Sequence, residues 1–119
     1  AQGQSPGNLE NLYRAKGLYA TSTYSASEST IKYHLDKGRP VVVHGNFTSA
    51  GHIVLFIGYD ATGWYVNDPA GRWAGCWGCG YPNRTSANGK GVHYSYASVR
   101  SVIGTSGDIW ISVADKAPL

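Results

Sequence analysis

Apolar residues recur at helical spacing near the start of the chain. In the segment "SPGNLENLYRAKG", Leu9, Leu12 and Tyr13 fall on one face of a helix, and Gly17 follows the last apolar position. Glycine is the residue most often found just past a helix C-terminus. The pattern therefore predicts a short helix over residues 8–16.

A second helix is indicated by a stronger set of signals. Ser25 and Glu28 form a capping-box pattern ahead of the apolar positions Ile31 and Leu35. Gly38 stands where a C-terminal stop is expected. We expect this helix to end close to residue 38.

After "GRP" the apolar period changes from helical spacing to β-branched and aromatic runs. Three such runs, "VVVHGN" (41–46), "HIVLFIGYD" (52–60) and "WYVND" (64–68), are separated by short breaks that contain glycine. Runs of this length with turn residues between them predict an antiparallel meander.

The remainder of the chain is less periodic. Residues 69–91 are rich in glycine and predict a long loop, which in a compact domain is usually functional or tied by a disulfide. A short helix is predicted around 95–102 and a last strand over 108–113. Together these elements predict a single α+β domain over residues 1–119, with helices followed by an antiparallel sheet.

Composition narrows the class of protein. Of 119 residues, 42% are hydrophobic and 14% charged, which indicates a globular chain. Ten Lys and Arg against seven Asp and Glu give a net charge of only +3, and the basic residues are scattered, so a nucleic-acid partner is not expected. No apolar run is long enough for a membrane span, and no charged-then-apolar leader begins the chain. With nine Tyr, four Trp and sixteen Gly, the composition is typical of a secreted or cell-wall-associated bacterial domain.

The two cysteines, Cys76 and Cys79, lie in "GCWGCG". They predict a small disulfide-closed loop, or two free thiols, and the glycine-rich flanks make a poor helix start for a redox motif. A zinc site needs about four ligands, and His93 would supply only a third. We therefore expect no metal and no cofactor.

One histidine and one carboxylate stand where a catalytic pair could form. In an antiparallel hairpin the start of one strand lies beside the end of the next, so His52 and the pair Asn67 and Asp68 meet at one edge. A base and the group that orients it need such proximity. The alternative is a histidine that merely ends a strand.

The register of this hairpin decides which side chain can orient the ring. If Tyr59 pairs with Trp64 in a regular ladder, Asn67 shares the face of His52 and Asp68 points away. An extra residue in one strand would reverse this. Asn67 is the rival orienter.

The order of these segments resembles a known family. The stretch "LDKGRPVVVHGNFTSAGHIVLFIGYDATGWYVNDPAGRW", with "GKGVHYSYASV" and "GDIWISV" after it, is similar to the C-terminal half of the bacteriocin-processing cysteine peptidases, which cut after double-glycine leaders and belong to the papain-like superfamily. The resemblance covers about residues 25–115 and implies a papain-like fold. It also implies that His52 is the general base of a cysteine peptidase and Asp68 its orienter. For Asp68 to take that role, one strand needs an extra residue, so we predict a bulge or irregular pairing near Gly58 to Trp64 that brings the Asp68 carboxylate within hydrogen-bond reach of the ring.

The family's nucleophilic Cys, and the Gln before it, lie on a helix N-terminal to the segments seen here, and neither Cys76 nor Cys79 matches that position. Three explanations stay open. A second polypeptide carries the Cys; a serine, Ser5, Ser25 or Ser27, replaces it; or the chain is a non-catalytic relative that binds peptide or cell wall.

The resemblance leaves two further matters open. The substrate is a peptide or peptidoglycan amide, with no sequence feature to choose between them. If the nucleophile segment is absent, the face of the sheet that it would meet needs another cover, either the helix at 8–16 or a second copy of the chain. A structural domain of a larger secreted protein, tied by the cysteine loop, is a further hypothesis.

Other residues admit two interpretations each. His44 could point toward the same cleft, although an edge-strand polar residue is the simpler interpretation. The aromatic residues Trp64, Trp73, Trp77 and Tyr81 could line a carbohydrate or peptide groove by stacking, or cover a small core beneath the long loop.

Overall fold

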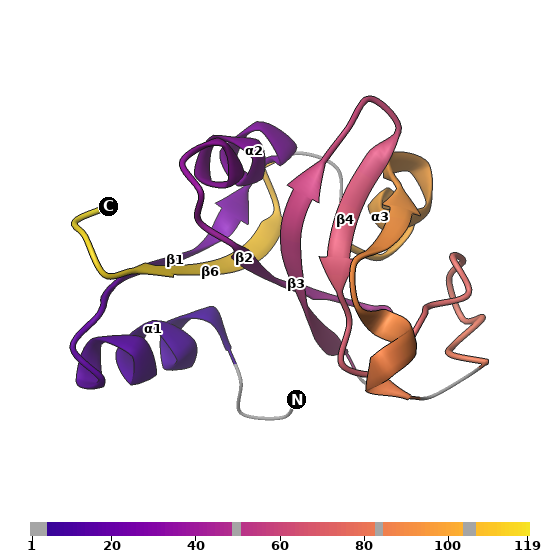
Figure 1. The fold of residues 1–119 in the computed structure, drawn as a ribbon, viewed down its shortest axis with the longest axis horizontal. Coiled ribbons are helices and arrows are strands. Elements are labelled where there is room, and N and C mark those ends of the chain that lie inside the picture. Colours follow the sequence, from indigo (N-terminus) through magenta and orange to yellow (C-terminus); the bar gives the residue numbers. More distant parts are fainter. Residues whose placement is uncertain (1–4, 49–50, 83–84, 104–106) are drawn as a thin grey trace.

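The fold is a single twisted sheet with helices on both of its faces (Figure 1). The computed structural model describes residues 5–48, 51–82, 85–103 and 107–119. Within them, six antiparallel strands lie in the order β1-β6-β2-β3-β4-β5. The elements are α1 (Pro6–Ala15), β1 (Tyr19–Ala26), α2 (Glu28–Asp36), β2 (Val41–Gly45), β3 (His52–Tyr59), β4 (Gly63–Asn67), the 3₁₀ turn η1 (Ser86–Gly89), β5 (Val92–Ser95), α3 (Tyr96–Ile103) and β6 (Ile109–Asp115).

Helix α1 is present but begins two residues earlier than the apolar spacing predicts. Pro6 stands in the first turn, where its missing N–H costs nothing. The side chain of Ser5 accepts a hydrogen bond from the Asn8 N–H at 3.2 Å. These N-terminal signals extend the helix beyond its apolar stripe.

Helix α2 is confirmed, but its predicted cap is wrong. Ser25 lies in strand β1, and the N-cap is Ser27, whose hydroxyl accepts from the Thr30 N–H at 3.2 Å. Thr30 completes the capping box by accepting from the Ser27 N–H at 3.3 Å. Threonine at this position does what Glu or Gln does in the usual motif. The predicted stop at Gly38 holds, since its φ of +78° is the left-handed conformation.

The three predicted strands at 41–46, 52–60 and 64–68 are confirmed to within a residue or two, and so are the helix near 95–102 and the last strand. The predicted order, helices followed by a sheet, is wrong. Strand β1 lies between α1 and α2, and α3 follows five of the strands. Strands β1 and β5 escaped prediction. In β1 the buried side chains are only Ala20 and Ala26, which carry little strand signal.

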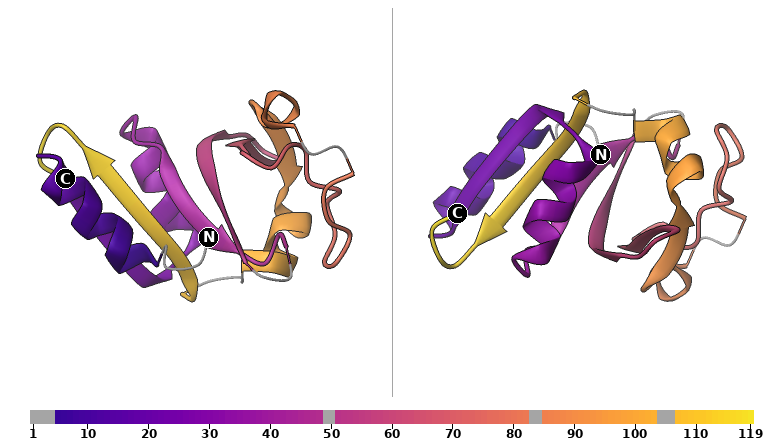
Figure 2. Two further views of the ribbon diagram at one scale, coloured as in Figure 1. Left: turned by 90° about the horizontal axis from the view of Figure 1, so that it is seen from below. Right: turned by 90° about the horizontal axis from the view of Figure 1, so that it is seen from above.

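The sheet has two faces with different covers. Paired residues such as Val43 and Val54, or Val41 and Phe56, point to one face and are at most 1% exposed. This core face is covered by α2 and α3, which bury Ile31 and several apolar residues of α3 against it. Helix α1 lies on the opposite side, along β1 and β6 (Figure 2).

Candidate active site

Strand β3 contains the predicted irregularity. Tyr59 pairs with Trp64 and Gly58 with Tyr65, but Phe56 pairs with Val66, so one extra residue, Ile57, is accommodated in β3. The extra residue changes the pairing by one position before the strand ends are reached. As a result, the side chains at the end of β4 point to the opposite faces of the sheet from those that a regular ladder would give them.

The bulge brings His52 and Asp68 to the same face. Nε2 of His52 lies 2.9 Å from Oδ1 of Asp68, within hydrogen-bond distance. The predicted contact is therefore confirmed as geometry. The Asp68 side chain is fully buried, whereas 17% of the His52 side chain is exposed. The carboxylate is shielded and the ring reaches the surface.

The Asp68 carboxylate is surrounded by donors. Oδ1 accepts from the Ala70 N–H at 3.1 Å in addition to His52. Oδ2 accepts from the Tyr81 hydroxyl at 2.7 Å and from the Tyr94 hydroxyl at 2.8 Å. Burial raises the pKa of Tyr94, so its hydroxyl keeps the proton that it donates. A buried carboxylate with four partners is held in one orientation.

The ring of His52 is held by aromatic neighbours as well. Its centroid lies 5.5 Å from that of Tyr81 and 6.4 Å from that of Phe47, both in edge-on packing. Because a carboxylate can only accept, Nε2 is the protonated nitrogen of the neutral ring. Nδ1 is then left with a lone pair and can take a proton.

Asn67 does not orient His52; its side chain binds the backbone of a neighbouring segment instead. Its Oδ1 accepts from the Gly91 N–H at 2.8 Å, and it pairs with Leu55, which points away from the face of His52. Nearby, the Asp68 N–H donates to the Gly89 carbonyl at 2.7 Å. The end of β4 is therefore fastened by the segment 89–91.

His44 does not face His52. It lies on β2, which is an interior strand between β6 and β3, so the edge-strand interpretation is also wrong. Gly45 is the residue that pairs with His52, and His44 pairs with Ile53 on the other face. Its Nε2 is buried without a hydrogen-bond partner among the described residues, and burial lowers the pKa of the ring.

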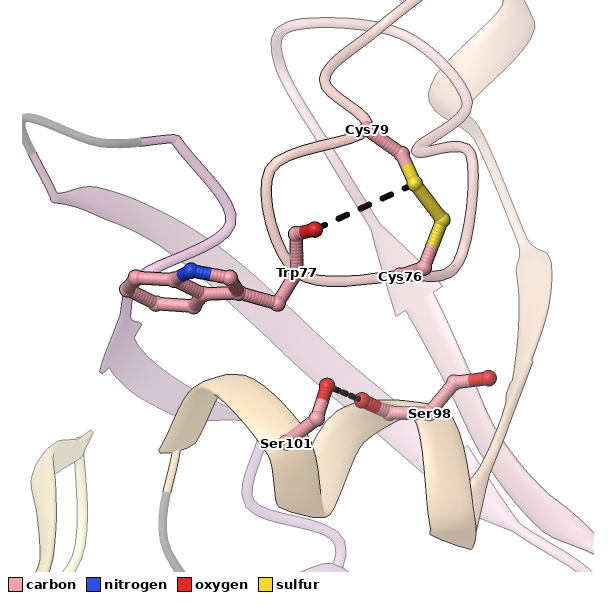
Figure 3. The surroundings of a disulfide bond; sticks show 5 residues. All are labelled: Cys76, Trp77, Cys79, Ser98 and Ser101. Carbon is pink, nitrogen blue, oxygen red and sulfur yellow. Dashed lines mark hydrogen bonds between the residues drawn. A yellow bond between two sulfur atoms is a disulfide. The ribbon is translucent and has the colours of Figure 1, made fainter.

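Cys76 and Cys79 are joined in a disulfide, with their Cα atoms 5.3 Å apart. The Cys79 N–H donates to the Cys76 carbonyl at 3.1 Å, which closes the turn between them. Figure 3 shows the Trp77 side chain projecting from this turn, and it is 59% exposed. The sequence has two cysteines, and both are in this bond, so the chain as printed holds no free thiol.

The other candidate residues separate into core and caps. Trp64, Trp73 and Tyr81 are at most 6% exposed and belong to the core, which favours that interpretation over a stacking groove. Among the serines, Ser5 and Ser27 cap helices and Ser25 lies in β1.

The sequence did not indicate that Tyr81 and Tyr94 bind Asp68. The sequence identified Tyr81 only as one of several aromatic residues and gave no role to Tyr94. Their hydroxyls meet one carboxylate from positions 13 and 26 residues away along the chain. No local pattern encodes such long-range contacts.

A pocket of about 410 Å³ lies beside the end of β4, next to Asp68. It is lined by Asn67, Asp68, Pro69, Gly89 and Lys90. In the described ranges, no group of three or more His, Cys, Asp or Glu side chains could hold a metal ion. None of the helices described is long and apolar enough to cross a membrane.

The comparison with protein families gave one match. Residues 3–100 match the Peptidase_C39 like family. This span includes His52, Asp68, Tyr81 and Tyr94. A search of the curated proteins found no match, and a search of the solved structures found none either.

Proposed function

We propose that this chain, which belongs to the Peptidase_C39 like family, is the histidine-bearing part of a cysteine peptidase. Its substrate would be a peptide or peptidoglycan amide bond. The observation that carries the proposal is the buried Asp68 carboxylate bound to Nε2 of the partly exposed His52. This is the arrangement that a general base and its orienting group require.

The chemistry follows from which nitrogen is engaged. Nδ1 of His52 takes the proton of a cysteine thiol, and the thiolate attacks the carbonyl carbon of the scissile amide. The imidazolium then gives that proton to the leaving amine. A water molecule, deprotonated by the same Nδ1, hydrolyses the thioester and releases the thiol. Asp68 keeps the ring aligned and stabilises its positive charge throughout.

The thiol has to come from residues outside the printed sequence, because both cysteines are in the disulfide. We propose a Cys-bearing segment, in a second polypeptide, that docks on the chain. The pocket beside Asp68 offers space for part of the substrate.

The Cys-bearing segment has to reach His52 from the core side of the sheet, because His52 and Asp68 lie on that face. Val42, His44, Ile53, Leu55 and Trp110 lie on the opposite face. The first four are half-buried and Trp110 is 47% exposed, but a thiol held on that face would be on the far side of the sheet from Nδ1 of His52. The point of approach is therefore the exposed part of the His52 ring, 17% of its side chain.

The hydrolytic function is tested with the protein purified together with its Cys-bearing segment. Hydrolysis of a double-glycine leader peptide and of a peptidoglycan cross-link fragment is measured for wild type, His52→Ala and His93→Ala. His93 serves as the control. It lies on β5, and its Nε2 is 3.2 Å from Oδ1 of Asp60, which is in the turn between β3 and β4. We expect His52→Ala to lose a factor of about 10³ or more in kcat and His93→Ala to retain activity. Equal activity of all three proteins, or binding without hydrolysis by wild type, would contradict the proposal.

A further inference from the structure

The two oxygens of the Asp68 carboxylate have separate tasks. Oδ1 faces His52, and Oδ2 accepts the hydroxyls of Tyr81 and Tyr94. Rotation of the carboxylate about its bond to Cβ would move both oxygens together. A donor that fixes Oδ2 therefore also fixes Oδ1 against Nε2 of His52.

Tyr81 and Tyr94 differ in what holds them. Tyr94 is part of strand β5 and is 4% exposed in the core. Tyr81 is also in the core, at 6% exposed, but it lies outside regular secondary structure, directly after the segment that contains the disulfide. Its hydroxyl makes the shortest of the hydrogen bonds to the Asp68 carboxylate, at 2.7 Å. The path of the loop that leads into Tyr81 therefore bears on where this hydroxyl lies.

This loop is closed by the disulfide between Cys76 and Cys79. The Ala74 N–H donates to the Gly80 carbonyl at 3.0 Å, so the two ends of the loop meet just before Tyr81. At the first end, the Trp73 N–H donates to the Tyr94 hydroxyl at 2.8 Å. Both ends of the disulfide loop therefore reach Oδ2 of Asp68, one through Tyr81 and the other through Tyr94.

We propose that Tyr81 is a positioning residue for the His52–Asp68 pair and that the disulfide loop is what holds it in place. The inference rests on the proposed function for its catalytic meaning. Its structural content is independent of any substrate: loss of the Tyr81 hydroxyl, or of the disulfide, loosens the hydrogen bond between Asp68 and His52.

The test is nitrogen-15 NMR of histidine-labelled chain at neutral pH, which reports which ring nitrogen of His52 is protonated and how fast that proton exchanges with water. Tyr81→Phe keeps the ring that packs on His52 and removes only the hydroxyl. We expect the Nε2 proton to exchange roughly tenfold faster, the factor that one net hydrogen bond represents. We also expect a measurable population protonated at Nδ1.

Tyr65→Phe is the matched control, because the Tyr65 hydroxyl donates to the Asp60 carboxylate at 2.8 Å, in the hairpin turn. It should leave the His52 signal unchanged. The double variant Cys76→Ser/Cys79→Ser removes an exposed bond and no core residue, so it tests the role of the loop even if Tyr81→Phe does not fold. We expect the same faster exchange at His52.

No substrate is used, so the outcome is separate from that of the hydrolysis assay. A folded Tyr81→Phe protein with wild-type exchange and a single Nε2-protonated form would overturn the positioning role. Wild-type behaviour of the double cysteine variant would overturn the role of the loop.

Discussion

Gly89 is where a single methyl group should damage the candidate site most. A Cβ at this residue would lie 1.9 Å from the Asp68 carbonyl oxygen and 3.0 Å from that of Gly71. Both neighbours are backbone atoms, which cannot rotate away as a side chain can. Contacts of Cβ atoms below 3.0 Å essentially do not occur, so Gly89→Ala forces segment 89–91 and the end of β4 apart by about 1 Å.

The cost follows from the bonds that this movement breaks. The Asp68 N–H bond to the Gly89 carbonyl, 2.7 Å long, and the Gly91 N–H bond to the Asn67 side chain, 2.8 Å long, both join the parts that must separate. At about 1 kcal/mol for each net hydrogen bond, with strain added, Gly89→Ala should lower the free energy of unfolding by about 2–4 kcal/mol.

Urea denaturation measures this loss, and NMR of His52 shows whether the pair is disturbed with it. Gly91→Ala is the control. Its φ of +61° makes alanine unfavourable there, at a cost of about 1–2 kcal/mol, but a Cβ would meet nothing within 4 Å. A Gly89→Ala protein as stable as Gly91→Ala, with an unchanged His52 signal, would refute the close approach of Gly89 to Asp68.

Three other predictions concern stability. Burial lowers the pKa of His34 and of His44 below 6.5 in the folded protein. As the pH drops through 6.5, these two rings therefore bind protons in the unfolded chain before they do so in the folded one, and the free energy of unfolding falls. His44→Gln should reduce this pH dependence in denaturation curves taken between pH 5 and 8. Gly7→Ala in α1, where a Cβ meets only the Tyr24 hydroxyl at 3.8 Å, should raise the free energy of unfolding by about 0.5 kcal/mol in urea titrations. Phe56→Ala should cost about 3–5 kcal/mol and Ile57→Ala under about 1 kcal/mol, because the first side chain is buried and the second is 42% exposed; equal losses in urea titrations would contradict this placement of the two side chains.

The parts of the fold that the sequence predicted are those with dense local signals. Strands β2 to β4 are continuous β-branched and aromatic runs. Counting residues around the turn between β3 and β4 placed Asn67 on the face of His52, and the family resemblance led to the prediction of a bulge that brings Asp68 there instead. Strand β1 was missed because its inward residues are alanines and its outward ones are polar, which is neither a helical nor a strand pattern. Its pairing with β6, more than 80 residues later in the chain, is what makes it a strand.

The candidate site was predictable as a pair but not as a network. A hairpin is local, so spacing placed Asn67 and Asp68 near His52, and the family resemblance chose Asp68 over Asn67. The donors to Oδ2 of Asp68 come from the long loop and from β5, and the fastening by Gly89 comes from a 3₁₀ turn. These contacts depend on how the loop folds back over the sheet, which glycine-rich sequence does not specify.

The central claim is that Nδ1 of His52 is the base for a thiol held beside it. It is tested most directly by the rate of iodoacetamide alkylation of the docked cysteine as a function of pH, in wild type and in His52→Ala. We expect a thiol pKa well below the ordinary value of about 8.5 in wild type, because imidazolium stabilises the thiolate, and a return toward about 8.5 in His52→Ala. The same alkylation profile in both proteins would contradict it.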